Sequence, residues 1–398
     1  MLNWTNSGRP QAVAGRLLLT ACLSLGLVLS GAAPPGPALA QQGGPNPEMP
    51  PSLKVLTAPE PPDLADYIQD KASAIQLGKA LFWDMQVGSD GIVACASCHF
   101  HAGADARRKN QLSPGLLNQD FSGIPGNKYY TGGDVAFGNA AIAGVAGRPR
   151  FKPNYTLDVA SDFPFHARQD AEQQESPPLR DANDVSSSQG VKVTIFTGIN
   201  PGSAQDSGTP VFDPVFTLGG GTSPSRNLRR VEPVNSPTVI NSVFNFSNFW
   251  NGRANHIFNG ENSFGPADQA AGIWVNNLGN LQKVPLTMKF ASLASQATAP
   301  PVSDFEMSFG PNLDTGAPGR TWAHIGKKML TLRPLGKQLV HPADSVLGGL
   351  SRAGLSNGAV SGQPGLNTTY GDLIRAAFKP EYWNSSKMIR FTSPNAVL

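Results

Sequence analysis

The stretch Cys95-Ala96-Ser97-Cys98-His99 decides what kind of domain this chain of 398 residues can form. Two thiols three residues apart can add across the two vinyl groups of a haem, and the imidazole of the next residue can then bind the iron. Half of a zinc site is one alternative, but it needs two more soft ligands, and no cysteine follows Cys98. A redox-active CxxC pair is the other, but its flanks read as helix and loop rather than as a βαβ unit. The motif therefore predicts one covalent haem c, attached to Cys95 and Cys98, with His99 as iron ligand.

The N-terminus predicts export. Two arginines precede an apolar run at residues 17–29, and the sequence Ala-Leu-Ala at residues 38–40 fits the small-x-small cleavage pattern. The run is too short to cross a bilayer comfortably. We expect a signal peptide at residues 1–40 and a periplasmic protein, which agrees with the compartment where bacteria attach haem c. A retained anchor and lipidation at Cys22 are the alternatives, and the apolar run that continues beyond Cys22 argues against lipidation.

The composition limits the class of protein. The net charge is +3 with no long basic or acidic run, so nothing argues for a nucleic-acid partner. Hydrophobic residues make up 40% of the chain, enough for one large or two modest cores. With 43 glycines and 35 prolines, the chain should contain long ordered loops.

Hydrophobic periodicity divides the chain into segments. A Gly/Pro-rich flexible leader occupies residues 41–62, and a helix with Asp63 as N-cap is expected to run to Phe82. Its apolar stripe has helical spacing and consists of Leu64, Ile68, Ala72, Ile75 and Phe82. Periodicity is weak from about residue 110 to residue 232, which indicates a loop-rich insertion.

Further helices are expected within residues 314–335 and 370–378. Between them and the insertion lies an aromatic-rich segment whose Phe244, Phe246, Phe249 and Trp250 we expect to be buried. The fold class expected from these segments is mainly α, with a cytochrome c-like haem domain at 63–309 that carries the insertion.

Three separated blocks resemble a known family. LGKALFWDMQVGSDGIVACASCHFHAGADARRKNQLSPG (77–115) resembles the first haem segment of bacterial di-haem cytochrome c peroxidases and their relatives. VNSPTVINSVFNFSNFWNGRA (234–254) is similar to the family's Asn-Ser-Pro-Thr…Phe-Trp-Asp-Gly-Arg block, with Asn251 where aspartate is usual. SLASQATAPPVSDFEM (292–307) is similar to its Gln…Glu-Met block. The blocks occur in the family's order, which is more specific than any one of them alone.

The resemblance implies roles for four further residues. Glu306 matches the general acid/base that moves a proton between the two oxygens of peroxide, so that water leaves rather than hydroxide. Gln296 matches the amide that orients substrate and carboxylate, and Trp250 the aromatic residue between two haems. Asn235 matches a ligand of a calcium ion. Without the resemblance, Glu306 reads as a surface carboxylate, Trp250 as a core residue, and Gln296 and Asn235 as turn or cap residues.

The resemblance also implies partners. Hydrogen peroxide is the expected substrate, and a small cytochrome or cupredoxin the expected electron donor. Some relatives carry a distal histidine at the sixth iron position. His101, His166 and His256 are candidates by residue type, and the sequence favours none of them.

The chain departs from the family in one respect. No second CxxCH motif follows the first, so a second covalent haem is impossible in this sequence. We expect residues 310–398 to be the incomplete start of a second cytochrome c domain, in a truncated peroxidase with impaired turnover that exposes apolar surface and can form a homodimer. The alternatives are a mono-haem electron-transfer or haem-binding protein, and a remnant that binds no haem.

Overall fold

We analysed a computed structural model of the chain. It describes residues 55–99, 107, 109–113, 166–173, 175–176, 178–181, 185–213, 215–218 and 222–387. The expected signal peptide, most of the leader, His101 and much of the insertion lie outside these residues. Residues 58–398 form one compact unit, and residues 1–57 are a separate one.

The expected mainly α fold is wrong. In the described part of the chain, 25% of residues are helical and 20% lie in strands, so the fold is mixed α/β with small sheets. Every sheet found there is an antiparallel pair of strands. The physical reason is that a chain so rich in glycine and proline breaks its helices early and closes tight hairpins instead.

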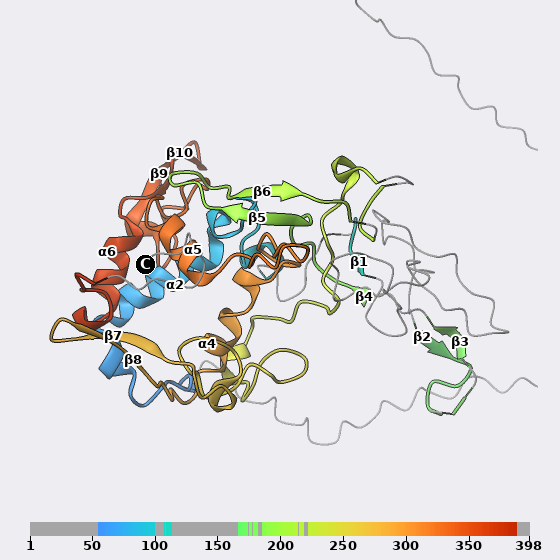
Figure 1. Cartoon of the computed structure of the whole chain (residues 1–398), viewed down its shortest axis with the longest axis horizontal. Coiled ribbons are helices and arrows are strands. Elements are labelled where there is room, and N and C mark those ends of the chain that lie inside the picture. The colour runs from blue at the N-terminus through green and yellow to red at the C-terminus, as the bar shows by residue number, and fades with distance from the viewer. Residues whose placement is uncertain are drawn as a thin grey trace, which may run out of the picture. The chain divides into compact units, whose positions relative to one another are not determined.

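The elements follow one another along the chain as short pieces (Figure 1). The α-helices are α1 (Leu64–Tyr67), α2 (Lys71–Trp83), α3 (Ala96–His99), α4 (Ser292–Ala297), α5 (Trp322–Met329) and α6 (Tyr370–Ala377). The paired strands are β1 (Leu112–Ser113) with β4 (Val185–Ser186), β2 (His166–Arg168) with β3 (Pro178–Asp181), β5 (Thr194–Gly198) with β6 (Ser207–Pro210), β7 (Ile273–Asn277) with β8 (Asn280–Val284), and β9 (Ser351–Ser356) with β10 (Ala359–Leu366). The 3₁₀ turns are η2 (Met85–Val87), η4 (Pro224–Arg226), η5 (Ser242–Phe244), η6 (Gly265–Ala267), η7 (Pro300–Val302), η8 (Gly348–Leu350) and η9 (Pro380–Tyr382).

Hairpin turns explain part of the unexpected strand content. Asn357 and Gly358 join β9 to β10 with φ angles of 52° and 78°, the left-handed pair that a two-residue turn needs. Leu278 and Gly279 join β7 to β8 in the same way, with φ angles of 49° and 87°. These turns are local, so Asn-Gly at 357–358 was a readable hairpin signal in the sequence.

The single helix expected from Asp63 to Phe82 is two helices. Ile68 is extended and forms a β-bridge with Phe378, which interrupts the helix after α1. Asp70, not Asp63, caps the second helix, because its side chain accepts a hydrogen bond from the Ser73 amide at 2.8 Å. The buried face of α2 is formed by Leu77 and Ala80, whereas Ile75 is 50% exposed.

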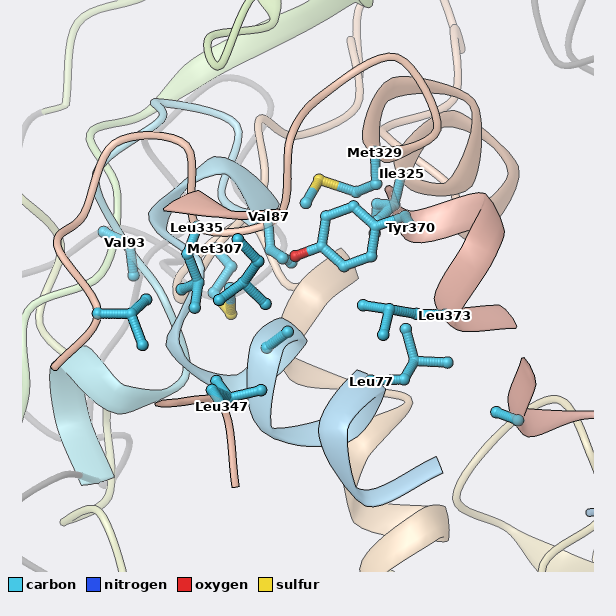
Figure 2. Packing of buried hydrophobic residues seen from close by; sticks show 14 of the residues in the cluster. Leu77, Val87, Val93, Met307, Ile325, Met329, Leu335, Leu347, Tyr370 and Leu373 are labelled. Atoms are coloured by element: carbon cyan, nitrogen blue, oxygen red, sulfur yellow. The ribbon is translucent and has the colours of Figure 1, made fainter. Parts of the chain in front are cut away.

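The main hydrophobic core joins segments distant in sequence. Helix α2 packs against α6, and Leu77 of α2 lies near Leu373 of α6 (Figure 2). Met307 and Ile325 belong to the same cluster. The cluster therefore has members on both sides of residue 309, and the domain boundaries drawn from the sequence stay predictions.

A buried carboxylate organises this core. Asp84, which has no exposed surface, accepts hydrogen bonds from the Tyr370 hydroxyl (2.7 Å), the Leu335 amide (2.7 Å) and both nitrogens of Gln86 (2.8 and 3.1 Å). We call Asp84 with these three partners the Asp84 hub. Burial and the nearby Asp84 charge raise the pKa of Tyr370, so its hydroxyl keeps its proton and donates.

A second buried polar group is ionic. Asp206, Arg320 and Lys328 are fully buried, and Asp206 pairs with the other two at 2.9 and 3.1 Å. Lys328 also donates to the carbonyl oxygens of Gly88 and Ala204 at 3.0 Å each. Burial lowers the pKa of Arg320 to about 10 and that of Lys328 to about 8. This ionic cluster ties α5 to two loops.

Among the described residues, no helix has the length and apolar character needed to cross a membrane.

Candidate functional site at the CxxCH motif

The CxxCH motif forms one helical turn. The amides of Cys98 and His99 donate to the Cys95 carbonyl at 3.2 and 3.3 Å, and the Ser97 hydroxyl accepts from the Ala94 amide at 3.0 Å. Residues three apart lie on the same face of a helix, so Cys95 and Cys98 project together. The local hydrogen bonds of the motif thus produce the spacing that thioether attachment requires.

The His99 imidazole is held by a residue from a distant block. Its Nδ1 lies 3.0 Å from the carbonyl oxygen of Pro237, and this contact fixes Nδ1 as the N–H nitrogen. The other ring nitrogen, Nε2, is thereby left as the metal-binding atom. Burial lowers the pKa of His99, and the bond to Pro237 opposes that shift, so the ring is neutral as a ligand must be.

The Glu-Met block meets the motif at Cys95. The Cys95 sulfur lies 3.9 Å from the Met307 sulfur, although the two residues are 212 positions apart. Burial and then the negative charge of Glu306 raise the pKa of the Cys95 thiol to about 12. A redox CxxC pair needs a thiol that ionises easily, so this environment argues against the redox alternative.

These donors fit a covalent haem. Cys95 and Cys98 are half-buried, free of a disulfide and on one helical turn, and His99 is neutral with Nδ1 fixed. Among the described residues, no cluster of three or more His, Cys, Asp or Glu side chains is able to hold a metal ion.

Glu306 is the acidic group near this motif. Loss of solvation raises the pKa of Glu306 to about 7, against the opposing charge of Arg253. An ordinary glutamate is fully ionised at neutral pH, whereas the raised pKa of Glu306 brings its titration close to neutral pH. Glu306 can therefore both donate and accept a proton near neutral pH.

The block at 234–254 connects the site to the surface. The indole N–H of Trp250 donates to the Asn235 carbonyl at 2.6 Å, and the Ser236 hydroxyl donates to Ser188 at 2.9 Å. The Pro237 carbonyl then contacts His99. One three-residue stretch, 235–237, thus joins an exposed indole to the imidazole of the motif.

The expectation that the aromatic side chains of this block are buried is wrong. Trp250 and Phe246 are each 69% exposed, and Phe244 is 37% exposed. Phe249 is half-buried under the guanidinium of Arg253, 3.9 Å from its ring centre. Phe246 stacks on His256 at 4.0 Å, which places this candidate sixth ligand in a surface aromatic pair. A run of aromatic residues can only be buried if other segments cover it, and spacing alone cannot reveal that.

The remaining candidate residues are placed less closely. Gln296 is half-buried near the end of α4 and shares no hydrogen bond with Glu306 in the described part of the chain. The Asn235 side-chain nitrogen donates to the Ser186 carbonyl at 2.9 Å. His166 lies in β2, and His101 is outside the described residues. The roles of these residues in orienting substrate, in calcium binding and at the sixth iron position stay predictions.

Sequence reasoning missed Glu232. This residue lies three positions before Asn235, inside the stretch Val231-Glu232-Pro233-Val234 that leads into the second block. Its Oε1 atom is buried and has no hydrogen-bond partner among the described residues. Burial raises the pKa of Glu232 well above its ordinary value, and the charges of Glu306 and Asp304 add to that effect. A carboxylate beside a recognised block was the available signal.

Comparison with known proteins agrees with the motif. Residues 72–188 match the family model described as di-haem cytochrome c peroxidase. The matched segment contains the CxxCH motif and ends before the blocks at 234–254 and 292–307. Neither the curated proteins nor the solved structures gave a match to the chain.

Proposed function

We propose that this protein is an exported c-type haem peroxidase that reduces hydrogen peroxide with electrons from a small cytochrome or cupredoxin, because residues 72–188 match the family model described as di-haem cytochrome c peroxidase. The match implies haem c and peroxidase-type oxidoreductase chemistry at the level of the family. The observation that carries the proposal for this chain is the Glu306 carboxyl, which influences Cys95 of the attachment motif and has a pKa raised to about 7.

The chain's own residues would hold the cofactor as follows. Cys95 and Cys98 supply the two thioether bonds, and His99 supplies the imidazole Nε2. When bound there, the haem supplies an iron centre that exchanges single electrons. The Pro237 carbonyl fixes the orientation of His99, because its contact with Nδ1 at 3.0 Å restrains rotation of the ring.

Glu306 would transfer a proton between the two oxygens of peroxide. Reduction of one hydrogen peroxide to two waters consumes two electrons and two protons. A carboxyl with a pKa near 7 can take a proton from one peroxide oxygen and give it to the departing one, so that water leaves.

Trp250 would receive electrons from the donor protein. Its ring is 69% exposed, and its N–H binds the Asn235 carbonyl two residues before the carbonyl that contacts His99. The calcium ion that the resemblance implies at Asn235 would act on the same stretch. The one CxxCH motif of this sequence would attach one haem.

The test is a rapid-mixing measurement of peroxide consumption by the haem-loaded protein with a reduced small c-type cytochrome. We expect Glu306→Gln to slow peroxide consumption by about 10²–10⁴-fold, the range typical of losing a general acid/base. The matched control is Glu261→Gln, whose partly exposed side chain pairs with Lys283 far from the motif in sequence, and it should change the rate by less than about twofold.

Two results would count against the proposal. Equal peroxide consumption by wild type and Glu306→Gln would remove the assigned role of Glu306. A haem-loaded wild-type protein that exchanges electrons with the cytochrome but consumes no peroxide would instead establish the mono-haem electron carrier.

A further inference from the structure

Glu232 and Glu306 lie on two segments that flank a third. The Glu232 amide donates to the Ser188 carbonyl at 3.0 Å, and the Gly190 amide donates to the Arg230 carbonyl at 2.9 Å. On its other side, the same stretch binds the segment of Glu306, since the Val191 amide donates to the Phe305 carbonyl at 3.3 Å. The stretch 188–191 thus holds the two glutamates in a fixed relation.

Gly190 allows this close arrangement. A Cβ atom at position 190 would lie 1.7 Å from the Phe305 carbonyl oxygen and 2.7 Å from that of Glu306. Both distances are far below any real carbon contact, so no other residue fits without moving the segment of Glu306. The close approach of the three segments is therefore a built feature of the fold.

One oxygen of the Glu232 carboxyl, Oε1, is buried and has no hydrogen-bond partner in the described part of the chain. Arg230 is the nearest cation in sequence, but its guanidinium pairs with Asp213 at 3.0 Å and with Asp304 at 3.1 Å. A buried carboxylate with no partner is costly, so a carboxyl in this position favours its protonated form.

The charges around the two glutamates also favour a protonated Glu232. Glu306 and Asp304 raise the pKa of Glu232, and Arg230 lowers it. The charge of Arg253 lowers the pKa of Glu306, and the charge of Glu306 in turn raises the pKa of the Cys95 thiol, which stays neutral. Of two interacting carboxyls, one keeps its proton when the other ionises, and here Glu232 is the one that keeps it.

We propose that Glu232 is a positioning residue of the peroxide site, a carboxyl that keeps its proton and thereby leaves Glu306 as the member of the pair that exchanges protons. The proposal rests on the proposed function for its role in peroxide reduction, although the carboxyl pair itself does not. Glu306 takes a proton from one peroxide oxygen and returns it to the departing one, so it ends each cycle in the state in which it began. With Glu232 neutral, the pair does not carry two negative charges at once, and no electron moves.

Infrared spectroscopy of the haem-loaded protein, with ¹³C-labelled glutamate and without peroxide, tests the pair. The C=O stretch of a protonated glutamate should persist above neutral pH in wild type and be absent in Glu232→Gln. Glu306→Gln should lower the midpoint of the Glu232 titration by about one pH unit, a tenfold change in proton affinity, because the charge that opposes ionisation of Glu232 is gone. Glu261→Gln, with its exposed carboxyl, should leave both signals unchanged.

Two results would overturn the inference. One is a wild-type spectrum that shows no protonated glutamate above neutral pH. The other is a Glu232 titration that does not move in Glu306→Gln, a variant that keeps Glu232 intact and serves even if Glu232→Gln fails to fold. If the two carboxyls are coupled but the protein consumes no peroxide, the proposed function is wrong and the carboxyl pair stands. If peroxide consumption depends on Glu306 but the carboxyls are not coupled, the proposed function stands and the pair is wrong.

Discussion

The Asp84 hub and the Glu232–Glu306 pair hold buried carboxyls in opposite ways. Asp84 receives hydrogen bonds from Tyr370, Leu335 and Gln86, so its lone pairs are used. Among the described residues, one oxygen of Glu232 has no hydrogen-bond partner, and the pKa values of both glutamates are raised. A fully bonded carboxylate stabilises one structure, whereas a poorly bonded one stays ready to exchange protons. The comparison separates the core that maintains the fold from the site that can perform chemistry.

The core around Asp84 and the block at 234–254 also differ in solvent exposure. Tyr370 and Leu373 are buried in the core, where Figure 2 shows them facing Leu77 and Met329. Phe246 and Trp250 in the block at 234–254 are largely exposed. If the core and the site are independent, core substitutions should lower the free energy of unfolding and leave the titration of Glu306 unchanged.

The largest stability effect should come from the ionic cluster. Asp206→Asn removes the anion that pairs with Arg320 and Lys328 and leaves two cations buried. We expect a loss of about 3–5 kcal/mol in the free energy of unfolding, measured by urea denaturation. Asp314→Asn, at an exposed position, is the control and should change it by less than about 0.5 kcal/mol. A loss below about 1 kcal/mol in Asp206→Asn would show that this cluster does not stabilise the core.

An intermediate effect should follow from weakening the Asp84 hub. Tyr370→Phe keeps the ring and removes the 2.7 Å hydrogen bond to Asp84. We expect the free energy of unfolding to fall by about 1–2 kcal/mol, because a buried acceptor loses a donor. Tyr382→Phe is the matched control, since that hydroxyl makes a 3.2 Å bond at the surface, and it should have almost no effect. A shifted Glu306 titration in Tyr370→Phe would show that the core and the site are not independent.

The smallest effect should appear at low pH. The Asp344 carboxylate accepts hydrogen bonds from Lys79 at 2.7 and 2.8 Å and from the amides of Val346 and Leu347. Although burial raises it, these bonds lower the pKa of Asp344 to about 2, below the 3.8 of an ordinary aspartate. A lowered acid pKa stabilises the fold above about pH 4, and that contribution is lost as the pH falls towards 2.

Because the Asp344 and Lys79 side chains are about a quarter exposed, at 25% and 28%, solvent weakens the pair. We expect it to contribute about 1 kcal/mol. Urea denaturation at about pH 5 and about pH 2.5 should show this part of the acid sensitivity in wild type and lose it in Asp344→Asn. An unchanged acid sensitivity in the variant would assign the effect to other carboxyls.

Sequence reasoning worked where the cause is local. The CxxCH turn follows from hydrogen bonds within five residues, and α6 follows from helical spacing and lies within the expected residues 370–378. It failed where contacts between distant segments decide the conformation or the burial of a residue. Ile68 leaves the helix to pair with Phe378, and Trp250 is exposed because little covers it. The strand content was missed because tight turns such as Asn357-Gly358 outweigh a weak helical pattern.

By itself, the sequence determined the attachment motif: two thiols and an imidazole on one helical turn, in a segment that matches the di-haem cytochrome c peroxidase family model. It could do so because neighbours along the chain set that geometry. Only the tertiary structure decided that Pro237 orients His99, that Met307 lies against Cys95, and that the segments of Glu232 and Glu306 both bind the stretch 188–191. These relations depend on which segments pack together, and burial, which sets the proton affinity of a carboxyl, exists only once the chain has folded.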